Sequence, residues 1–208
     1  MEIAGRNISV GTIVLIVLGI FVLWGGIFGI WGISWYNGTV NANEDVKGQW
    51  GKVESAYQRR ADLIPNLVNT VKGYAKHESD VLIQVTQARA SVGQTKIDPS
   101  KMTAQDIQNF EQSQGTISSA ISRLLVVAEQ YPDLKANQNF LALQSQLEGT
   151  ENRINTERNY FNEIATTYNK RIQRIPGKLF NALAGFEEKP YFAAKAGADV
   201  APTVDFNK

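Results

Sequence analysis

The stretch VGTIVLIVLGIFVLWGGIFGIWGI, residues 10–33, is almost wholly apolar or glycine and indicates a membrane protein. No charged side chain lies between Asn7 and Asn43. As a helix, these roughly two dozen residues would extend about 36 Å, and the hydrocarbon core of a bilayer is about 30 Å thick. We therefore expect a transmembrane helix over residues 10–36, after a short N-terminal segment at residues 1–9.

A secretory signal peptide is the alternative interpretation of this stretch. Its apolar region is usually about 7 to 15 residues long and ends at a cleavage site of small residues. Here the apolar run is longer, and it ends among Trp31, Trp35 and Tyr36. Such aromatic side chains are typical of the boundary between a membrane and water, so we expect the helix to be retained as an anchor.

Glycine is frequent in this segment, and Gly25 and Gly29 have the GxxxG spacing. Two helices with this spacing can approach each other closely, which favours self-association in the membrane. The alternative is that glycine is simply common in membrane helices. Self-association through Gly25 and Gly29 is one hypothesis for this segment.

The composition of the chain excludes several kinds of site. The 21 Lys and Arg nearly balance the 20 Asp and Glu, so the net charge provides no field that would attract nucleic acid. With no cysteine and His77 as the single histidine, the chain lacks thiolate zinc sites, disulfides and two-histidine metal motifs. We expect no cofactor, no metal, no nucleic acid and no small-molecule substrate.

After a linker predicted at residues 37–43, apolar residues follow a period of 3.5, which is typical of a long helix packed along one seam. We expect this helix to run over residues 44–92, either kinked at Pro65 or broken there, with Asp62 capping a new helix. The seam consists of Val46, Trp50, Val53, Tyr57, Ile64, Leu67, Val71, Tyr74, Val81, Val85, Ala88 and Val92.

Two further seams predict a second helix that Thr103 caps and Pro132 ends, and a third from about Asn137 to Pro176. The fold class is therefore all-α, an antiparallel bundle of three long helices, or four if the first breaks near residues 62–65. We expect the bundle to occupy residues 44–186, including a short last helix, and an extended tail to occupy residues 187–208.

The three helices differ in length, at about 73, 42 and 57 Å, so they cannot cover one another end to end. We expect the part of the first helix nearest the membrane to lack a partner in its own chain and to form a protein interface. The tail is either disordered or docked, on its own bundle or on a neighbouring subunit, and its aromatics favour docking. The interface candidates are Val46, Trp50, Val53 and Tyr57 in the seam, and Tyr191, Phe192 and Phe206 in the tail.

Several charged residues lie in or beside the apolar seams, where an unpaired charge would cost several kcal/mol. We expect them to pair, with Arg59 or Arg60 meeting a carboxylate such as Glu151 or Glu157, and to set the register of the helices. The catalytic alternative would need Glu78, Glu157 and His77 to meet in one pocket. The candidates for buried polar residues that set register are Arg59, Arg60, Glu78, Glu151 and Glu157.

Long motifs in this chain resemble those of the LemA family of bacterial single-pass membrane proteins. They are RRADLIPNLV at residues 59–68, TVKGYAKHE at 70–78, ENRI at 151–154 and KPYF at 189–192. The resemblance implies a membrane-anchored helical bundle with no established enzymatic activity or cofactor, located in the bacterial inner membrane. Arg6 before the apolar segment and Lys47 after it slightly favour a bundle on the periplasmic side.

We therefore expect a non-enzymatic scaffold or interaction protein of the bacterial cell envelope that forms homo-oligomers. The alternative function is an adaptor or regulator of a membrane protease or another envelope enzyme, with Trp50 and Tyr57 as its binding face; another envelope protein is thus a possible partner. An enzymatic role would require Glu78 or Glu157 to line a solvent-filled pocket.

Overall fold

The structure is a computed structural model that describes residues 10–75, 77–92 and 97–193. The described residues contain helices and no strand, which confirms the all-α prediction. In chain order the helices are α1 (Val10–Tyr74), α2 (Ser79–Val92), α3 (Ala104–Ala128), α4 (Pro132–Lys135), α5 (Gln138–Gln173) and α6 (Gly177–Ala184).

Helix α1 is a single helix of 65 residues, about 98 Å long, that joins the apolar segment to the bundle. The linker predicted at residues 37–43 is wrong, because these residues are helical. Thr39 is fully buried, and Gly38 lies against Arg171 of α5. Packing against α5 therefore holds the helix together where Asn37 and Gly38 have weak helix propensity.

The predicted single helix over residues 44–92 is also wrong, and the chain breaks at a different place from the one considered. Helix α1 continues past Pro65 and ends at Tyr74, and α2 begins at Ser79 and runs in the opposite direction. The Glu78 amide donates to the Ala75 carbonyl between the two helices (3.2 Å), and Ala75 is fully buried. The first predicted helix is thus a hairpin of α1 and α2.

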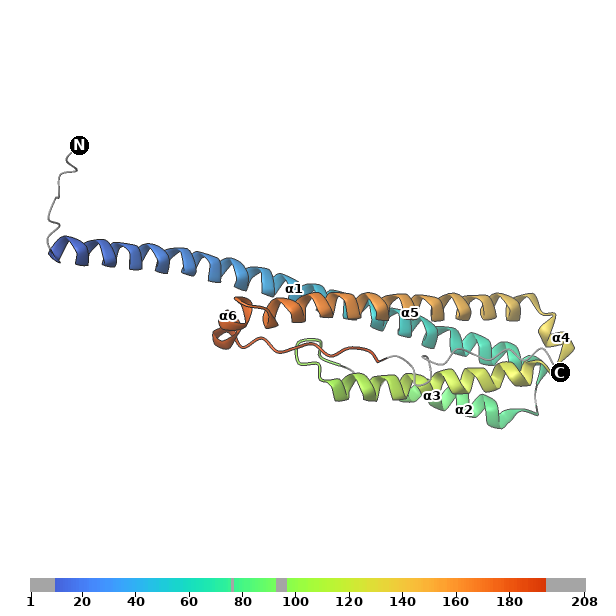
Figure 1. The fold of residues 1–208 in the computed structure, drawn as a ribbon. Helices are drawn as coiled ribbons and strands as arrows, with labels where there is room; N and C mark the ends of the chain where they lie inside the picture. Colours follow the sequence, from blue (N-terminus) through green and yellow to red (C-terminus); the bar gives the residue numbers. More distant parts are fainter. Residues whose placement is uncertain (1–9, 76, 93–96, 194–208) are drawn as a thin grey trace, which may run out of the picture.

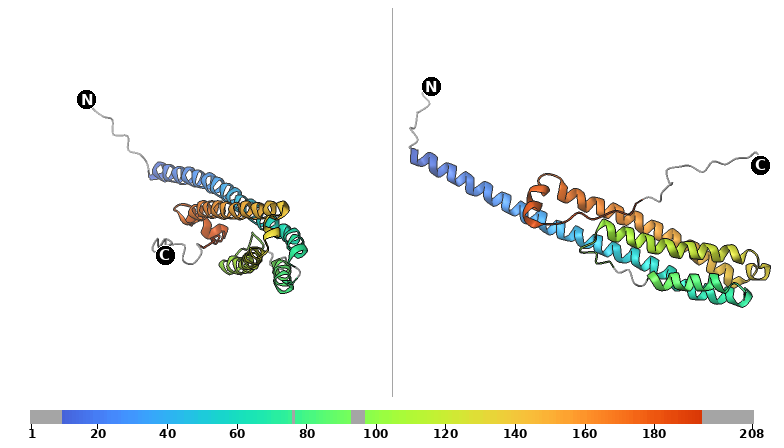
Figure 2. Two further views of the ribbon diagram at one scale, coloured as in Figure 1. Left: turned by 90° about the vertical axis from the view of Figure 1, so that its right-hand side faces the viewer. Right: turned by 90° about the horizontal axis from the view of Figure 1, so that it is seen from below.

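The bundle consists of the C-terminal part of α1 together with α2, α3 and α5 (Figures 1 and 2). Helix α5 lies along α1, and α3 lies along α2. Helix α4 connects α3 to α5 at the end of the bundle far from residue 10, and α6 lies at the opposite end. This arrangement brings α6 and the start of the tail close to the apolar segment of α1.

Two apolar clusters fill the bundle. The distal cluster lies around Leu67, Val85, Leu124 and Leu134, near α4. The proximal cluster is aromatic and lies nearer the apolar segment; its large members include Trp35, Trp50, Tyr57, Phe110, Phe161, Tyr168, Phe180 and Phe192.

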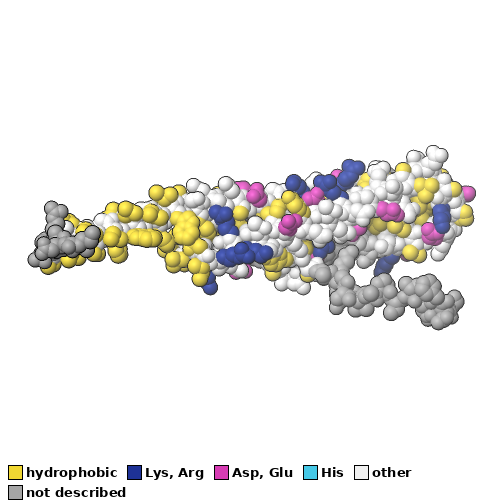
Figure 3. All heavy atoms as spheres, turned by 45° about the horizontal axis from the view of Figure 1, so that its top comes forward, with side chains coloured by type: hydrophobic (Ala, Val, Ile, Leu, Met, Phe, Trp, Pro, Cys, Tyr) yellow, Lys and Arg dark blue, Asp and Glu magenta, His cyan; other side chains and the backbone are white. Residues whose placement is uncertain are grey.

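Residues 10–31 of α1 are each exposed, and most of them project beyond the bundle. Figure 3 shows that hydrophobic side chains cover this projecting half and that charged side chains begin where the bundle begins. Within the described residues, α1 is the one helix long and apolar enough to cross a membrane. Residues 10–33 are therefore a candidate membrane span.

Candidate functional site

The seam predicted to lack a partner is covered by its own chain, so that prediction is wrong. Val46, Trp50, Val53 and Tyr57 are each at most 5% exposed. Three other elements supply the cover, because the Trp50 ring lies 5.3 Å from Phe110 of α3, 5.7 Å from Phe161 of α5 and 5.9 Å from Phe192 of the tail.

The break between α1 and α2 makes this cover possible. Helix α2 doubles back beside α1, so that α3 begins nearer the apolar segment and its Phe110 reaches Trp50 and Tyr57 of α1. The adaptor hypothesis had Trp50 and Tyr57 as its binding face. Both side chains are core residues, so that face is not available to another protein.

The start of the tail is docked on its own bundle. Asn162 donates to the Phe192 carbonyl and accepts from the Phe192 amide, both at 2.9 Å. Seven residues further along α5, Asn169 forms the same pair of bonds with the main chain of Lys189, both at 2.8 Å, and also donates to the Tyr191 hydroxyl. Two asparagines two helical turns apart thus hold the extended tail along α5.

This docking confirms the preference for a docked tail as far as residue 193. Phe192 is a core residue, whereas Tyr191 is 46% exposed. The remaining tail candidate, Phe206, lies outside the described residues.

Two titratable groups fasten the tail to the bundle. The ammonium group of Lys189 donates to the carbonyls of Pro99 and Ser100 (3.2 Å each), and burial lowers the pKa of Lys189, with the nearby charge of Lys47 adding to the effect. The Tyr168 hydroxyl donates to the Glu187 carbonyl (3.0 Å). Burial, with a smaller contribution from the Glu187 carboxylate, raises the pKa of Tyr168 to about 12.

Arg60 forms the polar centre of the bundle, as its position in the seam predicted. Its guanidinium donates to Glu151 (3.0 Å), to Ser118 (2.8 Å) and to the side-chain oxygen of Gln114 (2.7 Å). The expected pairing of Arg60 with Glu151 is confirmed. Arg59 is exposed and lies outside this network.

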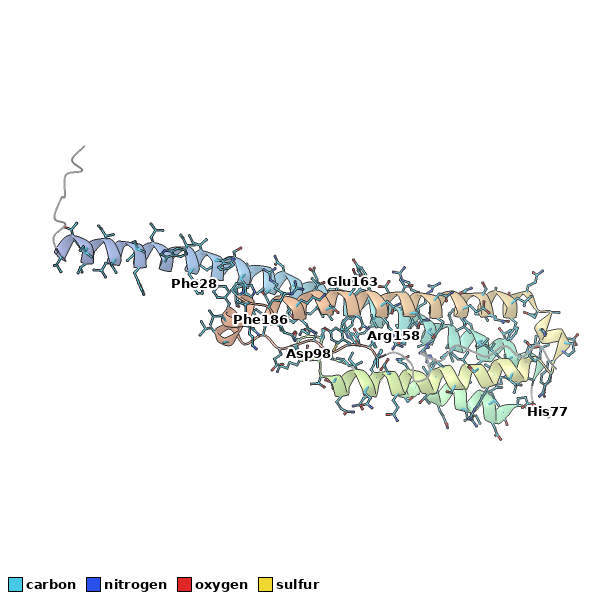
Figure 4. The ribbon with its side chains drawn as sticks, in the orientation of Figure 1. Phe28, His77, Asp98, Arg158, Glu163 and Phe186 are labelled. Carbon is cyan, nitrogen blue, oxygen red and sulfur yellow. The ribbon has the colours of Figure 1, made fainter. Side chains whose placement is uncertain are left out.

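The other two polar candidates lie in different parts of the bundle. Glu157 is buried, accepts a bond from Gln49 (2.6 Å) and pairs with Arg153. Glu78 accepts a bond from Tyr131 (3.1 Å) near the turn between α1 and α2. His77 is exposed at the distal end of the bundle (Figure 4).

The structure does not bring Glu78, Glu157 and His77 into one pocket. Gln49, the partner of Glu157, is about 37 Å along α1 from Tyr74, where the turn begins. Among the described residues, no group of three or more His, Cys, Asp or Glu is placed to hold a metal ion.

A joint between the apolar segment and the bundle was not predicted. We call it the neck, and it consists of Trp35, Gly38, Thr39, Arg171, Gly177 and Phe180. The Arg171 guanidinium donates to the Thr39 hydroxyl (2.9 Å) and to the Trp35 carbonyl (3.1 Å), while the Trp35 indole donates to the Arg171 carbonyl (3.2 Å).

Two glycines permit this close approach. A Cβ atom on Gly38 would collide with the Arg171 guanidinium, and one on Gly177 would collide with the Arg171 carbonyl and lie 2.7 Å from the Trp35 indole nitrogen. In the sequence, Arg171 lies in the third predicted helix and Gly38 in the predicted linker, so neither residue alone indicates this contact. Glycine is common in linkers, but a glycine in a helix also permits close packing of another segment. Only the atoms that lie beside the glycine distinguish these two roles.

The projecting apolar helix, the neck and the bundle define a membrane-associated helical-bundle protein. The sequence profile of the LemA family matches residues 49–206, which is most of the chain. The chain belongs to the LemA family, whose members are membrane proteins.

Individual relatives agree with this assignment. The chain is 26% identical over 181 residues to the magnetosome proteins MamQ 1 and MamQ 2 of Paramagnetospirillum magneticum, an alignment that covers 79% of this chain and 66% of each relative. It is 26% identical over 152 residues to the protein LemA of Metamycoplasma hominis, covering 73% of this chain and 66% of that protein. The chain thus spans slightly less than two thirds of the length of these relatives.

Proposed function

We propose that this protein is a non-enzymatic scaffold of the bacterial inner membrane, which self-associates through its membrane helix and holds its bundle on the periplasmic side. The observation that carries the proposal is the continuity of α1 from the exposed apolar segment into the bundle core. A contact made within the membrane would therefore fix the position of the bundle, because no flexible linker separates the two.

The surface available for self-association is the apolar half of α1. The proximal seam is covered by its own chain, whereas Gly25 and Gly29 lie on one exposed face of the helix with open space where a Cβ would project. Helices associate in membranes largely through close packing at small residues. The GxxxG face is thus the best-supported contact between copies.

The test is the mass of the full-length protein in several detergents, measured by light scattering. We expect an oligomer, and we expect the variant Gly25→Leu with Gly29→Leu to be monomeric while its helical circular dichroism is unchanged. The matched control is Gly19→Leu with Gly26→Leu, on a face about 90° away, which should retain the oligomer. A native protein that is monomeric in every detergent would refute self-association.

The membrane face can be tested separately, since the chain contains no cysteine. A cysteine introduced at the exposed residue Val126 in α3 is unique in the protein. We expect a membrane-impermeant maleimide to label it in cells with a permeabilised outer membrane and an intact inner membrane. Labelling only after the inner membrane is broken would place the bundle in the cytoplasm.

A further inference from the structure

Helix α6 and the residue that precedes it by two positions expose large apolar side chains at the end of the bundle nearest the candidate membrane span. Ile175 is 90% exposed, Leu179 is 60% exposed and Leu183 is 91% exposed. Among the described residues of the bundle, Ile175 and Leu183 are the most exposed large hydrophobic side chains. A bundle surface facing water would be expected to carry polar residues at these positions.

The apolar face of α6 is wider than the area that α1 covers. Successive helical residues are about 100° apart, so Leu179 and Leu183 lie on the face adjacent to Phe180 and Ala184. Lys178 lies on the side of α6 opposite Phe180. Phe180 is buried against α1, whereas the two leucines remain exposed. Helix α6 is therefore amphipathic, and α1 occupies only part of its apolar face.

The contacts of Phe180 fix the level of α6 along α1. Its ring centroid lies 4.9 Å from that of Phe28, 6.0 Å from that of Trp31 and 5.6 Å from that of Trp35. Figure 4 shows Phe28 and Phe186 at the end of the bundle where α6 meets α1. Helix α6 thus lies beside the last turns of the apolar segment, at the level of tryptophans typical of the membrane boundary.

Three exposed cations accompany this apolar surface, namely Lys170, Arg174 and Lys178. Arg171 is a fourth cation in this part of the chain, but its guanidinium is engaged in the neck. Figure 3 shows Lys and Arg side chains gathered where the apolar surface ends and the bundle begins. Apolar residues bordered by cations are typical of helices that lie in the interface of a membrane with anionic lipids.

We infer that α6 is a second membrane contact, lying in the headgroup boundary of the same bilayer that α1 crosses. Ile175, Leu179 and Leu183 enter the outer part of the acyl layer, and the three cations contact lipid phosphates. The inference rests on the proposed function in one respect, namely that α1 spans a bilayer. Continuity of this surface with the apolar segment favours a bilayer as its occupant over a second copy of the chain.

The consequence is a bundle fixed at two points. A helix that crosses a membrane alone can tilt and rotate about its axis. The second contact at α6, joined to α1 through the neck, would restrict both motions and hold the bundle at a defined angle to the membrane.

The experiment uses single-cysteine variants of the full-length protein in lipid nanodiscs, each with one nitroxide label on its cysteine. The discs contain phosphatidylcholine with about one third phosphatidylglycerol, and the measurement is accessibility to oxygen relative to a water-soluble nickel chelate. We expect Leu183→Cys to show an oxygen-to-nickel ratio several-fold above that of Val126→Cys, a bundle residue with an exposed side chain. Val17→Cys, in the apolar segment, reports whether α1 spans the bilayer.

The outcomes separate the two proposals. A label at position 17 in contact with water would overturn both the span and the second contact. A membrane-embedded label at 17 with a water-exposed label at 183 would overturn only the second contact. A label at 183 that neither oxygen nor the nickel chelate reaches would show that another copy, rather than lipid, covers α6.

A charge variant tests the phosphate contacts. Replacing Lys170, Arg174 and Lys178 with glutamate should lower the oxygen-to-nickel ratio at position 183 in discs with phosphatidylglycerol, with a smaller effect in pure phosphatidylcholine. The matched control replaces Lys72, Lys101 and Arg123, which are exposed elsewhere in the bundle, with glutamate. Equal effects of the two triple variants would overturn the assignment of the cations to lipid phosphates.

Discussion

The two halves of α1 are parts of one helix with opposite surroundings. Residues 10–31 are apolar around the whole circumference and exposed, whereas residues 35–74 carry an apolar stripe that is buried on one side. A helix that is apolar all round requires an apolar environment on every side, while a stripe requires only one protein surface. The difference shows that the distribution of polar residues around a helix, rather than its length or continuity, determines whether the helix suits a membrane or a protein surface.

Polar groups sharpen the contrast between the halves. In the bundle half, the buried side chains of Arg60, Gln49 and Thr39 each make hydrogen bonds. The apolar half contains no charged residue. Buried polar groups are tolerated where neighbouring helices supply partners, and lipid supplies none.

The largest effect should come from the aromatic cluster that covers the bundle half. We expect Trp50→Ala to lower the free energy of unfolding by about 3–5 kcal/mol, because it leaves a cavity among Phe110, Phe161 and Phe192. Circular dichroism during denaturant unfolding in detergent measures the change. Trp24→Ala in the exposed half is the control and should have little effect; equal losses would show that the halves do not differ in this way.

A smaller loss is expected from the polar centre of the bundle. Arg60→Met removes the donor to Gln114 and Glu151 and should cost about 2–3 kcal/mol, less than a fully buried ion pair because Glu151 is partly exposed. Arg59→Met, at an exposed neighbouring position, should change the stability by no more than about 0.5 kcal/mol. If the two variants unfold at the same denaturant concentration, the Arg60 network does not stabilise the bundle.

The neck, where the halves meet, should respond to a single methyl group. We expect Gly177→Ala to destabilise the protein by about 1–3 kcal/mol, because its Cβ would collide with the Arg171 carbonyl. Gly48→Ala, at an open position in α1, should instead stabilise the protein by about 0.5–1 kcal/mol. Thermal unfolding of the two variants provides the comparison, and a stabilised Gly177→Ala protein would contradict the proposed packing.

The smallest effect should come from Tyr168, which holds the tail against the bundle half of α1. It should appear only at high pH. The pKa of Tyr168 is raised to about 12 from 10.0, so the folded state retains the proton after the unfolded state has lost it. The contribution of Tyr168 to stability is therefore complete below pH 10 and falls between pH 10 and about 12.

Denaturant unfolding from pH 9 to 12 tests this prediction. The stability advantage of the native protein over Tyr168→Phe should decrease across that window. Tyr160→Phe, at an exposed position of α5, is the control and should follow the native curve. A constant difference between the native protein and Tyr168→Phe would show that Tyr168 does not couple tail docking to pH.

Much of the bundle could be predicted because helical periodicity is a local property. Most seam positions of α1, α3 and α5, the Thr103 cap of α3 and the pairing of Arg60 with Glu151 agree with the structure. Tyr74, the last seam position of α1, is an exception, because its side chain is 42% exposed. The reversal between α1 and α2 could not be found in this way, because the seam period continues from Tyr74 to Val81 in α2 once Glu78 fills the position between them. A period indicates which face is buried, and it does not indicate whether one helix or two provide that face.

The prediction of the candidate sites depended more strongly on the break between α1 and α2 than the prediction of the fold class did. With α1 and α2 as one helix, Trp50 and Tyr57 were expected to be free, and with a hairpin they lie in the core. The neck was missed for a related reason, since Gly38, Arg171 and Gly177 are far apart in the sequence and each has an ordinary explanation alone. The role of each glycine follows only from the Arg171 atoms beside it.

Composition and helical period act over a few turns. They are therefore enough to predict that the chain is helical, that residues 10–33 are suited to a membrane and that the later helices bury one face each. The end of the first helix, the cover of Trp50 and the exposed face of α6 could be established only in three dimensions. These features depend on contacts between distant segments, whose free energy is shared among many side chains and cannot be assigned to any one stretch of sequence.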